Sequence, residues 1–542
     1  MEVRLVKSFS GKDAYKAAFI ILLFLQIIYM IYWGHVKSGY YVDEFFTYDK
    51  AHYLSASTPE RVKLYDADYM AYNKWFDLSE LKSTLTVDKD SSLFNDGIVY
   101  NVKAFMRLPY MFFMNYIETI FFAGELNKWS GISLNILFFA IGQFFLYLLA
   151  KKITNSGAAS LLAVALHGFS GLAISMVAFV RFYMLVNMWM IIFLYLHLLM
   201  WNENNLKRNI LYEVLAMAVL FLAFKNSPLV ILEGAGVILL FSVALFLRKR
   251  KRQFLFYALP IFFCALLYFS LFTDYMQIIY HLNDLKAVAS GSTQLKDAGV
   301  GLINNLTKLT PESFVSRSIM MVNFINDYLF AHIFVAAVFM VCVLAAAVRK
   351  VLRREQLDQG RKFAYFIIGG TIIIFFLAAV GLRLGILRYN SFLYHMIAIV
   401  IVAIATDISE RKFRSLMTLI LAAAVCGEIY FTVTIPRVEN SYPEDRAAVE
   451  AIRQNKGIDN LVVDYNLDDR VMYECLAFGD DTTKVMFMRI EEWDLKDTPD
   501  TMLVWQSVNW SAEVVDKLEK AGYTEIEQIA QTHESMVFLC QR

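Results

Sequence analysis

Long apolar segments alternate with short polar segments along most of this chain. A helix needs roughly 20 apolar residues to cross the hydrocarbon core of a bilayer, and about eleven segments approach that length. They are residues 17–34, 131–150, 157–179, 183–200, 210–224, 229–247, 254–273, 328–348, 363–382, 390–406 and 415–433. The pattern predicts an all-α polytopic membrane bundle over residues 1–433.

The basic residues between these segments predict an orientation. With a cytoplasmic N-terminus, Lys151-Lys152, Arg248 to Arg252 and Arg411 to Arg414 fall in short inner loops. Because cytoplasmic loops carry an excess of Lys and Arg, we expect a multi-pass protein of the cell membrane with its N-terminus inside and its C-terminus outside.

Residues 104–123 are also apolar, but a span there would place the cluster from Arg248 to Arg252 outside. Arg107, Pro109 and Glu118 lie within this stretch, and charged or helix-breaking residues are costly in lipid. We therefore expect a helix that lies on the outer surface or re-enters from it, within an outer loop of residues 35–130.

After the last apolar segment, residues 434–542 change to a pattern typical of soluble domains. Strand-like runs at 461–463, 484–488 and 502–505 alternate with polar helical stretches at 445–455 and 511–521. This alternation predicts a small extracytoplasmic α/β domain. No Gly-rich nucleotide fingerprint occurs in it, so we assign it no cofactor. A disulfide between Cys475 and Cys540 is left open.

The composition is typical of a membrane protein, and it gives no sign of a nucleic-acid partner. The chain is 58% hydrophobic and 19% charged, whereas a soluble protein has roughly 45–50% apolar and about 25% charged residues. The net charge of +1 does not point to nucleic acid. No Cys/His spacing predicts zinc, so we assign no metal ligand. Asp66-Ala67-Asp68 is of a type that binds divalent cations, and metal dependence is left open.

Asp43 and Glu44 are the first candidates for chemistry. They follow the first apolar segment by about ten residues, in Gly39-Tyr40-Tyr41-Val42-Asp43-Glu44-Phe45-Phe46. On an extended loop the two side chains would point to opposite sides, so one can face a cleft while the other anchors the loop to a basic residue. The aromatic neighbours would partly desolvate the carboxylate and make it a better base toward a hydroxyl. The alternative is an ordinary solvated acidic pair.

Four basic residues at predicted outer ends are candidates for holding a phosphate. Arg181 follows the third apolar segment, Lys225 follows the fifth, and Arg383 and Arg388 lie between the ninth and tenth. An arginine near lipid needs a partner, which can be a carboxylate or a phosphate. The alternative for each residue is an interfacial anchor whose charge reaches the lipid headgroups.

Taken in order, these features resemble the GT-C superfamily of membrane glycosyltransferases. The matching features are Asp43-Glu44 after the first span, a surface helix, Arg181-Phe182-Tyr183 after the third span and Arg388-Tyr389 before a late span. The likeness is to glycosyltransferase family 39 and the related bacterial branch of protein O-mannosyltransferases and lipid A aminoarabinose transferases. Where these families carry a basic residue followed by two prolines, this chain has Lys103 without the double proline.

The resemblance implies a GT-C-like bundle and an enzyme that moves a sugar from a polyprenyl-phosphate donor to a glycan, lipid or protein acceptor on the outer face, usually with inversion. It implies that Asp43, rather than Glu44, is the base, and that Arg181 and Arg388 lie near the donor phosphate. Arg383, beside Arg388, and Lys225, as a weaker member of the same outer group, remain candidates from their positions alone. Contacts from the surface helix would come from Lys103, Arg107 and Tyr110.

Two other classes of function remain alternatives. A transporter or flippase of a lipid-linked glycan would carry polar residues at mid-membrane depth, and Glu233 and Glu428 lie within apolar segments. A non-catalytic protein of cell-envelope assembly would use the C-terminal region for contacts. The missing double proline keeps that second alternative open.

Overall fold

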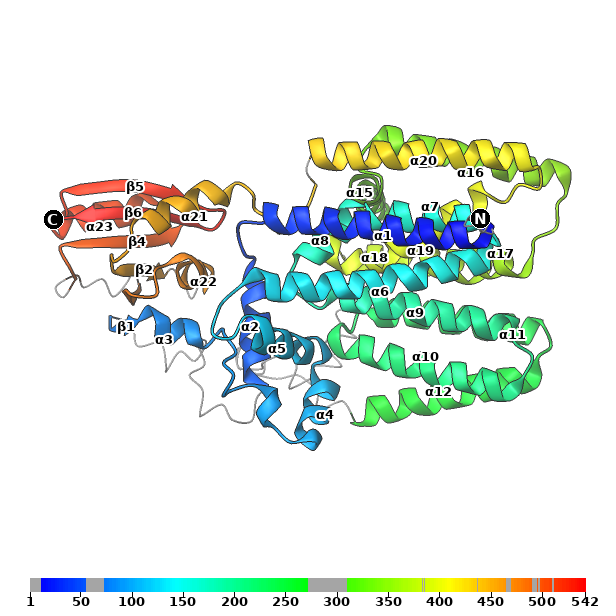
Figure 1. Ribbon diagram of the computed structural model, residues 1–542, viewed down its shortest axis with the longest axis horizontal. Coiled ribbons are helices and arrows are strands. Elements are labelled where there is room, and N and C mark those ends of the chain that lie inside the picture. Colours follow the sequence, from blue (N-terminus) through cyan, green and yellow to red (C-terminus); the bar gives the residue numbers. More distant parts are fainter. Residues whose placement is uncertain are drawn as a thin grey trace, which may run out of the picture. The chain divides into compact units, whose positions relative to one another are not determined.

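The computed structural model (Figure 1) divides into two compact units. The residues that it describes are 11–54, 73–271, 310–382, 384, 386–435, 437–464, 469–489, 495, 498–508 and 511–542. The first unit comprises Met1–Ile27, Phe138–Ile174 and Tyr183–Arg437, and the second comprises Ile28–Leu137, Ser175–Phe182 and Val438–Arg542. The division falls within three helices, namely α1 (Gly11–Val36), α6 (Lys128–Thr154) and α8 (Gly171–Ala178).

The first unit is helical. Its further helices are α7 (Gly157–Gly168), α9 (Tyr183–Asn202), α10 (Leu206–Asn226), α11 (Val230–Leu247), α12 (Lys251–Leu271), α15 (Pro311–Leu329), α16 (Ile333–Arg353), α17 (Gln359–Phe363), α18 (Gly369–Leu382), α19 (Phe392–Ala405) and α20 (Arg411–Thr434). A π-helical turn, η2 (Ala364–Ile368), joins α17 to α18, and a 3₁₀ turn, η3 (Leu387–Asn390), precedes α19.

Seven helices in the described part of the chain are long and apolar enough to cross a membrane, judged by length and composition. Helices α7 and α8 form a further, broken segment with a bend of 56°. The chain is thus a multi-pass membrane protein, as the apolar pattern predicts. The predicted number of eleven spans is not confirmed, because α10, α12 and α19 are helical but are not among those seven.

The apolar stretch 104–123 is divided between two short helices, α4 (Ile98–Arg107) and α5 (Pro109–Phe121). Proline has no backbone N–H and a fixed φ, so Pro109 suits the first position of α5 and cannot continue α4. Neither helix is among those that could span a membrane, as the sequence leads us to expect.

The second unit contains a six-stranded sheet. Its strands are β1 (Trp75–Asp77), β2 (Asn460–Asp464), β3 (Lys484–Arg489), β4 (Thr501–Ser507), β5 (Glu525–Gln531) and β6 (Ser535–Gln541), in the order β1-β3-β2-β4-β6-β5. Strand β2 is parallel to β3 and β4, and the outer pairs are antiparallel. The remaining elements are α2 (Val42–Tyr53), α3 (Leu78–Ser83), η1 (Leu93–Asn95), α21 (Asp445–Gln454), α22 (Asp469–Phe478) and α23 (Ser511–Lys520).

Both faces of this sheet are covered, because the side chains on either side of its central strands are buried. Leu461 and Val504 belong to a core that includes Val514 and Leu518 of α23. Their neighbours Val462 and Leu503 point to the opposite face, because side chains alternate along a strand, and they are buried as well. The predicted α/β character of the C-terminal region is confirmed. Cys475 and Cys540 are buried free thiols.

Strand β1 comes from the first long loop and not from the C-terminal region. It pairs antiparallel with β3, with Trp75 opposite Met486. Lys82 of α3 adds an ion pair to Asp481, with 2.7 Å between Nζ and Oδ1. The loop after the first span and the C-terminal region therefore contribute to one sheet.

We predict that Leu461→Ala destabilises this sheet. The leucine is fully buried in β2, and removing a buried leucine side chain costs about 2–5 kcal/mol. For a domain of this size such a loss lowers the thermal midpoint by about 10 °C, which can be measured on the detergent-purified protein. Glu527→Ala, at an exposed position of β5, is the control and should change the midpoint little. Equal shifts for the two variants would contradict this packing.

Candidate functional site

Asp43 and Glu44 lie in the first turn of helix α2, not on an extended loop. The expectation of a loop is therefore wrong. The helix begins here because Tyr41 has an extended backbone at the N-cap and its N–H donates to Glu44 Oε2 at 2.8 Å. Acidic side chains in a first turn also interact favourably with the helix dipole. Successive helical residues point about 100° apart, so the two carboxylates still have separate environments.

Glu44 is fully buried and all of its polar contacts are structural. Its Oε2 lies 3.0 Å from Nζ of Lys37, a lysine that is also fully buried. Its Oε1 accepts the backbone N–H of Val180 at 2.7 Å. Burial lowers the pKa of Lys37, and the Glu44 carboxylate opposes that shift by favouring the charged amine. Glu44 is thus the carboxylate that anchors the chain to a basic residue, as expected for one member of the pair.

The segment that receives Glu44 is held from the other side by α6. Asn135 Nδ2 donates to the carbonyl oxygens of Phe179 at 2.8 Å and of Val177 at 3.2 Å. Gly131, one turn earlier, leaves room for Val180, because a Cβ at position 131 would lie 2.0 Å from Val180 Cγ1. These contacts fix residues 177–180 and thereby the backbone of Arg181.

Arg181 points back onto the first turns of α2. Its Nη1 donates to the backbone oxygen of Asp43 at 2.8 Å and to Thr47 Oγ1 at 3.4 Å. The Nε–H group is buried and makes no hydrogen bond among the described residues. The guanidinium therefore keeps donor capacity beyond these two bonds.

Lys50 is a member of this cluster that the sequence interpretation missed. Asp43, Thr47 and Lys50 are spaced i, i+4 and i+7, which places them on one face of a helix. Burial lowers the pKa of Lys50, and the positive charge of Arg181 lowers it further, while Asp49 and Asp43 oppose the shift. The spacing was visible in the sequence, but it points to a shared face only once α2 is known to be helical.

The other predicted site residues have different surroundings. Tyr110 is fully buried at the start of α5, and Glu44 and Arg181 both act on it electrostatically. Lys103 and Arg107 are exposed on α4. In the first unit, the guanidinium of Arg388 lies over the ring of Tyr389, and the ammonium of Lys225 lies over the ring of Phe221. Arg383 and the tripeptide Asp66 to Asp68 lie outside the described residues.

The cluster of Asp43, Thr47, Lys50 and Arg181 combines one carboxylate with two cations. Asp43 and Lys50 are half-buried, so charges there are screened less than on an open surface. Such a set can accept a proton at the carboxylate and stabilise a developing phosphate charge at the cations. A second polar group in the same unit, Asp445, Glu474 and His533, contains three side chains of metal-ligand type.

No family model matches this sequence, and no curated protein matches it either. Among solved structures, the chain is similar to ArnT from Cupriavidus metallidurans bound to undecaprenyl phosphate, with 14% identity, 97% of each chain covered and a TM-score of 0.37. The apo state of the same protein has 13% identity, 98% of each chain covered and a TM-score of 0.39. These identities and scores are low, so the functional proposal depends on the residues of this chain.

We predict unequal losses of stability on substitution of the two neighbouring carboxylates. Glu44→Gln leaves the charge of Lys37 buried and unpaired, which costs about 3–5 kcal/mol. Asp43→Asn, in the same helical turn, should cost about 1 kcal/mol or less, the size of a helix-dipole contribution. Thermal midpoints of the purified variants measure both effects. The double variant Lys37→Met/Glu44→Gln should recover most of the loss, and a Glu44→Gln protein as stable as the wild type would refute the anchoring role.

Proposed function

We propose that this protein is a membrane glycosyltransferase that moves a sugar from a polyprenyl-phosphate donor to an acceptor hydroxyl. The observation that carries the proposal is the cluster on α2, in which Arg181 and Lys50 lie beside Asp43. Neighbouring Glu44 is fully engaged as an anchor, so we assign the chemistry to Asp43, which shares a helix face with Lys50. The resemblance of the sequence to GT-C enzymes, and its multi-pass character, support the same reading.

In the proposed reaction, Asp43 accepts the proton of the acceptor hydroxyl as its oxygen attacks the anomeric carbon of the sugar. The bond between that carbon and the phosphate oxygen breaks, and the polyprenyl phosphate leaves with the electron pair. Because a phosphate is a stable anion, it needs cations rather than a general acid, and Arg181 and Lys50 supply them. A single displacement of this kind inverts the configuration at the anomeric carbon.

The distribution of basic residues supports an outer location for this reaction. In the topology expected from the sequence, with a cytoplasmic N-terminus, clusters such as Arg248 to Arg252 fall in short inner loops and the loop that carries Asp43 falls outside. Arg388, Lys225 and Arg383 remain further candidates for contacts with the donor phosphate, and Lys103, Arg107 and Tyr110 remain candidates on the surface helices.

A second candidate function, transport of a lipid-linked glycan, is favoured by one observation in the first unit. Glu233 Oε1 lies 3.3 Å from His395 Nε2, and both side chains are fully buried. His167 lies next to His395, and its Nδ1 is 3.1 Å from Gln143 Nε2. Ionisable residues inside a helical membrane domain are costly and often line a substrate or proton pathway.

We predict that Asp43→Asn abolishes most sugar transfer. General-base catalysis contributes typically 10²–10⁴-fold to a rate, so turnover should fall by about 100-fold or more. The measurement is transfer from polyprenyl-phosphate sugars to candidate acceptors by the purified protein. Asp88→Asn, at an exposed loop position, is the matched control and should keep wild-type turnover. Full activity of Asp43→Asn would exclude Asp43 as the base, and transport without transfer would favour the second candidate function.

We also predict that Arg181→Met and Lys50→Met weaken binding of polyprenyl phosphate itself. Hydrogen bonds to charged groups contribute about 1.5–3 kcal/mol, so each loss should reduce affinity by about 10- to 100-fold. Binding can be measured by calorimetry in detergent without knowing the sugar. Asp43→Asn should bind polyprenyl phosphate at least as tightly as the wild type, because it removes a negative charge. Unchanged affinity in both cation variants would contradict the proposed phosphate site.

A further inference from the structure

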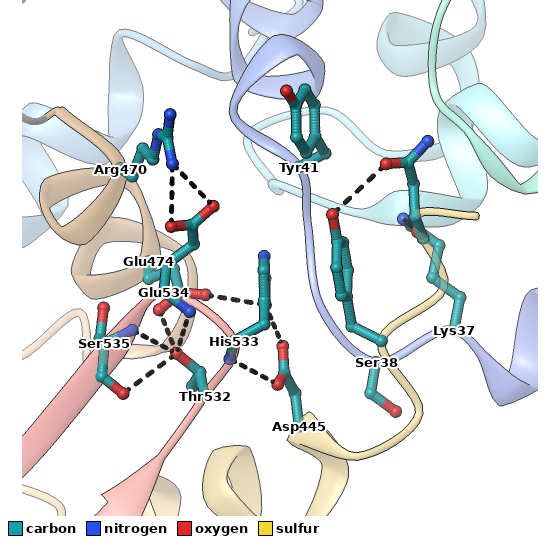
Figure 2. A network of polar contacts seen from close by, with 12 residues as sticks. Lys37, Ser38, Tyr41, Asp445, Arg470, Glu474, Thr532, His533, Glu534 and Ser535 are labelled. Carbon is teal, nitrogen blue, oxygen red and sulfur yellow. Dashed lines mark hydrogen bonds and ion pairs between the residues drawn. The ribbon is translucent and has the colours of Figure 1, made fainter. Parts of the chain in front are cut away.

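Three side chains of metal-ligand type meet in the second unit, and none of them belongs to the cluster on α2. Figure 2 shows Asp445, Glu474 and His533 converging from three elements. Asp445 is the first residue of α21, Glu474 lies on α22, and His533 lies in the turn between β5 and β6. The carboxylates are 1% exposed and the imidazole 12%.

The potential ligand atoms lie close enough for one ion to contact all three. His533 Nδ1 is 2.6 Å from Asp445 Oδ2 and 3.4 Å from Glu474 Oε1, and the ligand atoms all lie within 4.8 Å of one another. Zinc binds nitrogen and carboxylate oxygen at about 2.0–2.2 Å, so ligands of one ion stand roughly 3–4 Å apart. The 2.6 Å contact between Asp445 and His533 would have to open slightly for an ion to enter.

The second oxygen of each carboxylate is already held. Asp445 Oδ1 accepts the backbone N–H of His533 at 2.9 Å, and Glu474 Oε2 accepts the hydroxyl of Thr532. Tyr442 stacks on the imidazole ring, with 3.5 Å between centroids and 9° between planes. Ligands of real metal sites are oriented by outer contacts of this kind.

One ligand atom lacks the hydrogen bond that its burial calls for. Glu474 Oε1 is buried and accepts no hydrogen bond among the described residues. The two carboxylates thus meet at one buried point, where a divalent cation would balance negative charge.

We propose that Asp445, Glu474 and His533 bind one transition-metal dication, with zinc as the reference ion. The imidazole nitrogen and two carboxylate oxygens suit zinc, or manganese with lower affinity, better than magnesium or calcium, which prefer all-oxygen shells. His533 would bind through Nδ1 in its neutral form and keep its proton on Nε2. Three protein ligands leave a coordination position for water.

An ion at this site would restrain the segment that leads into α2. A Cβ at Gly39 would lie 2.3 Å from Asp445 Oδ2 and 3.2 Å from His533 Cε1, so the backbone of residue 39 lies directly against two of the ligands. Next to it, the N–H of Ser38 donates to the carbonyl oxygen of Ser441 at 2.9 Å. An ion at this position would order the chain a few residues before Asp43, and its binding does not depend on the proposed transfer reaction.

The test uses the full-length protein in detergent, freed of any polyhistidine tag and stripped with a chelator. We expect the wild type to take up one zinc ion per chain, as measured by elemental mass spectrometry and calorimetry, and to melt at a higher temperature with zinc than without it. Glu474→Gln keeps the shape of the ligand but removes its charge. It should weaken zinc binding by about 100-fold, the upper range found even for outer-contact changes.

Glu534→Gln is the matched control, because it makes the same chemical change at an acid that neighbours His533 but is paired with Arg470. It should bind zinc like the wild type. Thr532→Val, which removes the hydroxyl that holds Glu474, should weaken binding by about 10-fold. Failure of the stripped wild type to bind zinc stoichiometrically, or wild-type affinity in Glu474→Gln, would overturn the proposal.

If the Glu474→Gln protein fails to fold, cobalt binding by the wild type tests the site instead. Cobalt titrated into the stripped wild type should then give visible absorption bands that zinc abolishes in equimolar amount, and Glu534→Gln should give the same bands. Absence of these bands in the wild type would count against the site.

Discussion

Lys37 and Glu44 bring one positive and one negative charge, 3.0 Å apart, into the interior of the second unit. Removing two ions from water costs several kcal/mol each, and only good geometry and further hydrogen bonds offset that cost. Here Glu44 accepts the N–H groups of Tyr41 and Val180, and Lys37 donates to the carbonyl oxygen of Asn440 at 2.5 Å. The pair thus joins the end of α1, the start of α2, the segment before Arg181 and the start of the C-terminal region.

The contacts of the Lys37–Glu44 pair explain why the two adjacent carboxylates, Asp43 and Glu44, have different environments. Glu44 is enclosed and saturated with hydrogen bonds, whereas Asp43 is half-buried beside Arg181 and Lys50. Because Arg181 holds the backbone of Asp43 and follows the residue bonded to Glu44, the buried pair positions the carboxylate that we propose as the base. Environment rather than residue type separates the two roles, as it does wherever neighbouring carboxylates act differently.

The sequence predicts those elements whose signal is local. Strands β2, β3 and β4 are short apolar runs between polar helices, and they occur where the pattern places them. Strand β5 is mostly polar and β1 has only three residues, so neither has a pattern that a local reading can detect. The same limit applies to the sites. Asp43 and Arg181 are visible as charges that follow apolar segments. Lys37 as the buried partner of Glu44, and His533 beside Glu474, depend on how the chain folds back on itself.

The pairing of β1 with β3 also constrains the order in which the protein can be made. Strand β1 emerges early in synthesis, yet its partner is several hundred residues later in the chain. Until β3 has been synthesised and brought to the same side of the membrane, β1 has no neighbour, and the partners that the C-terminal region supplies to Lys37 are missing as well. Such long-range pairing is slow and leaves edges exposed during folding. The membrane helices can therefore be inserted long before the second unit matures, and a chain cut short before β3 would be stranded in that immature state.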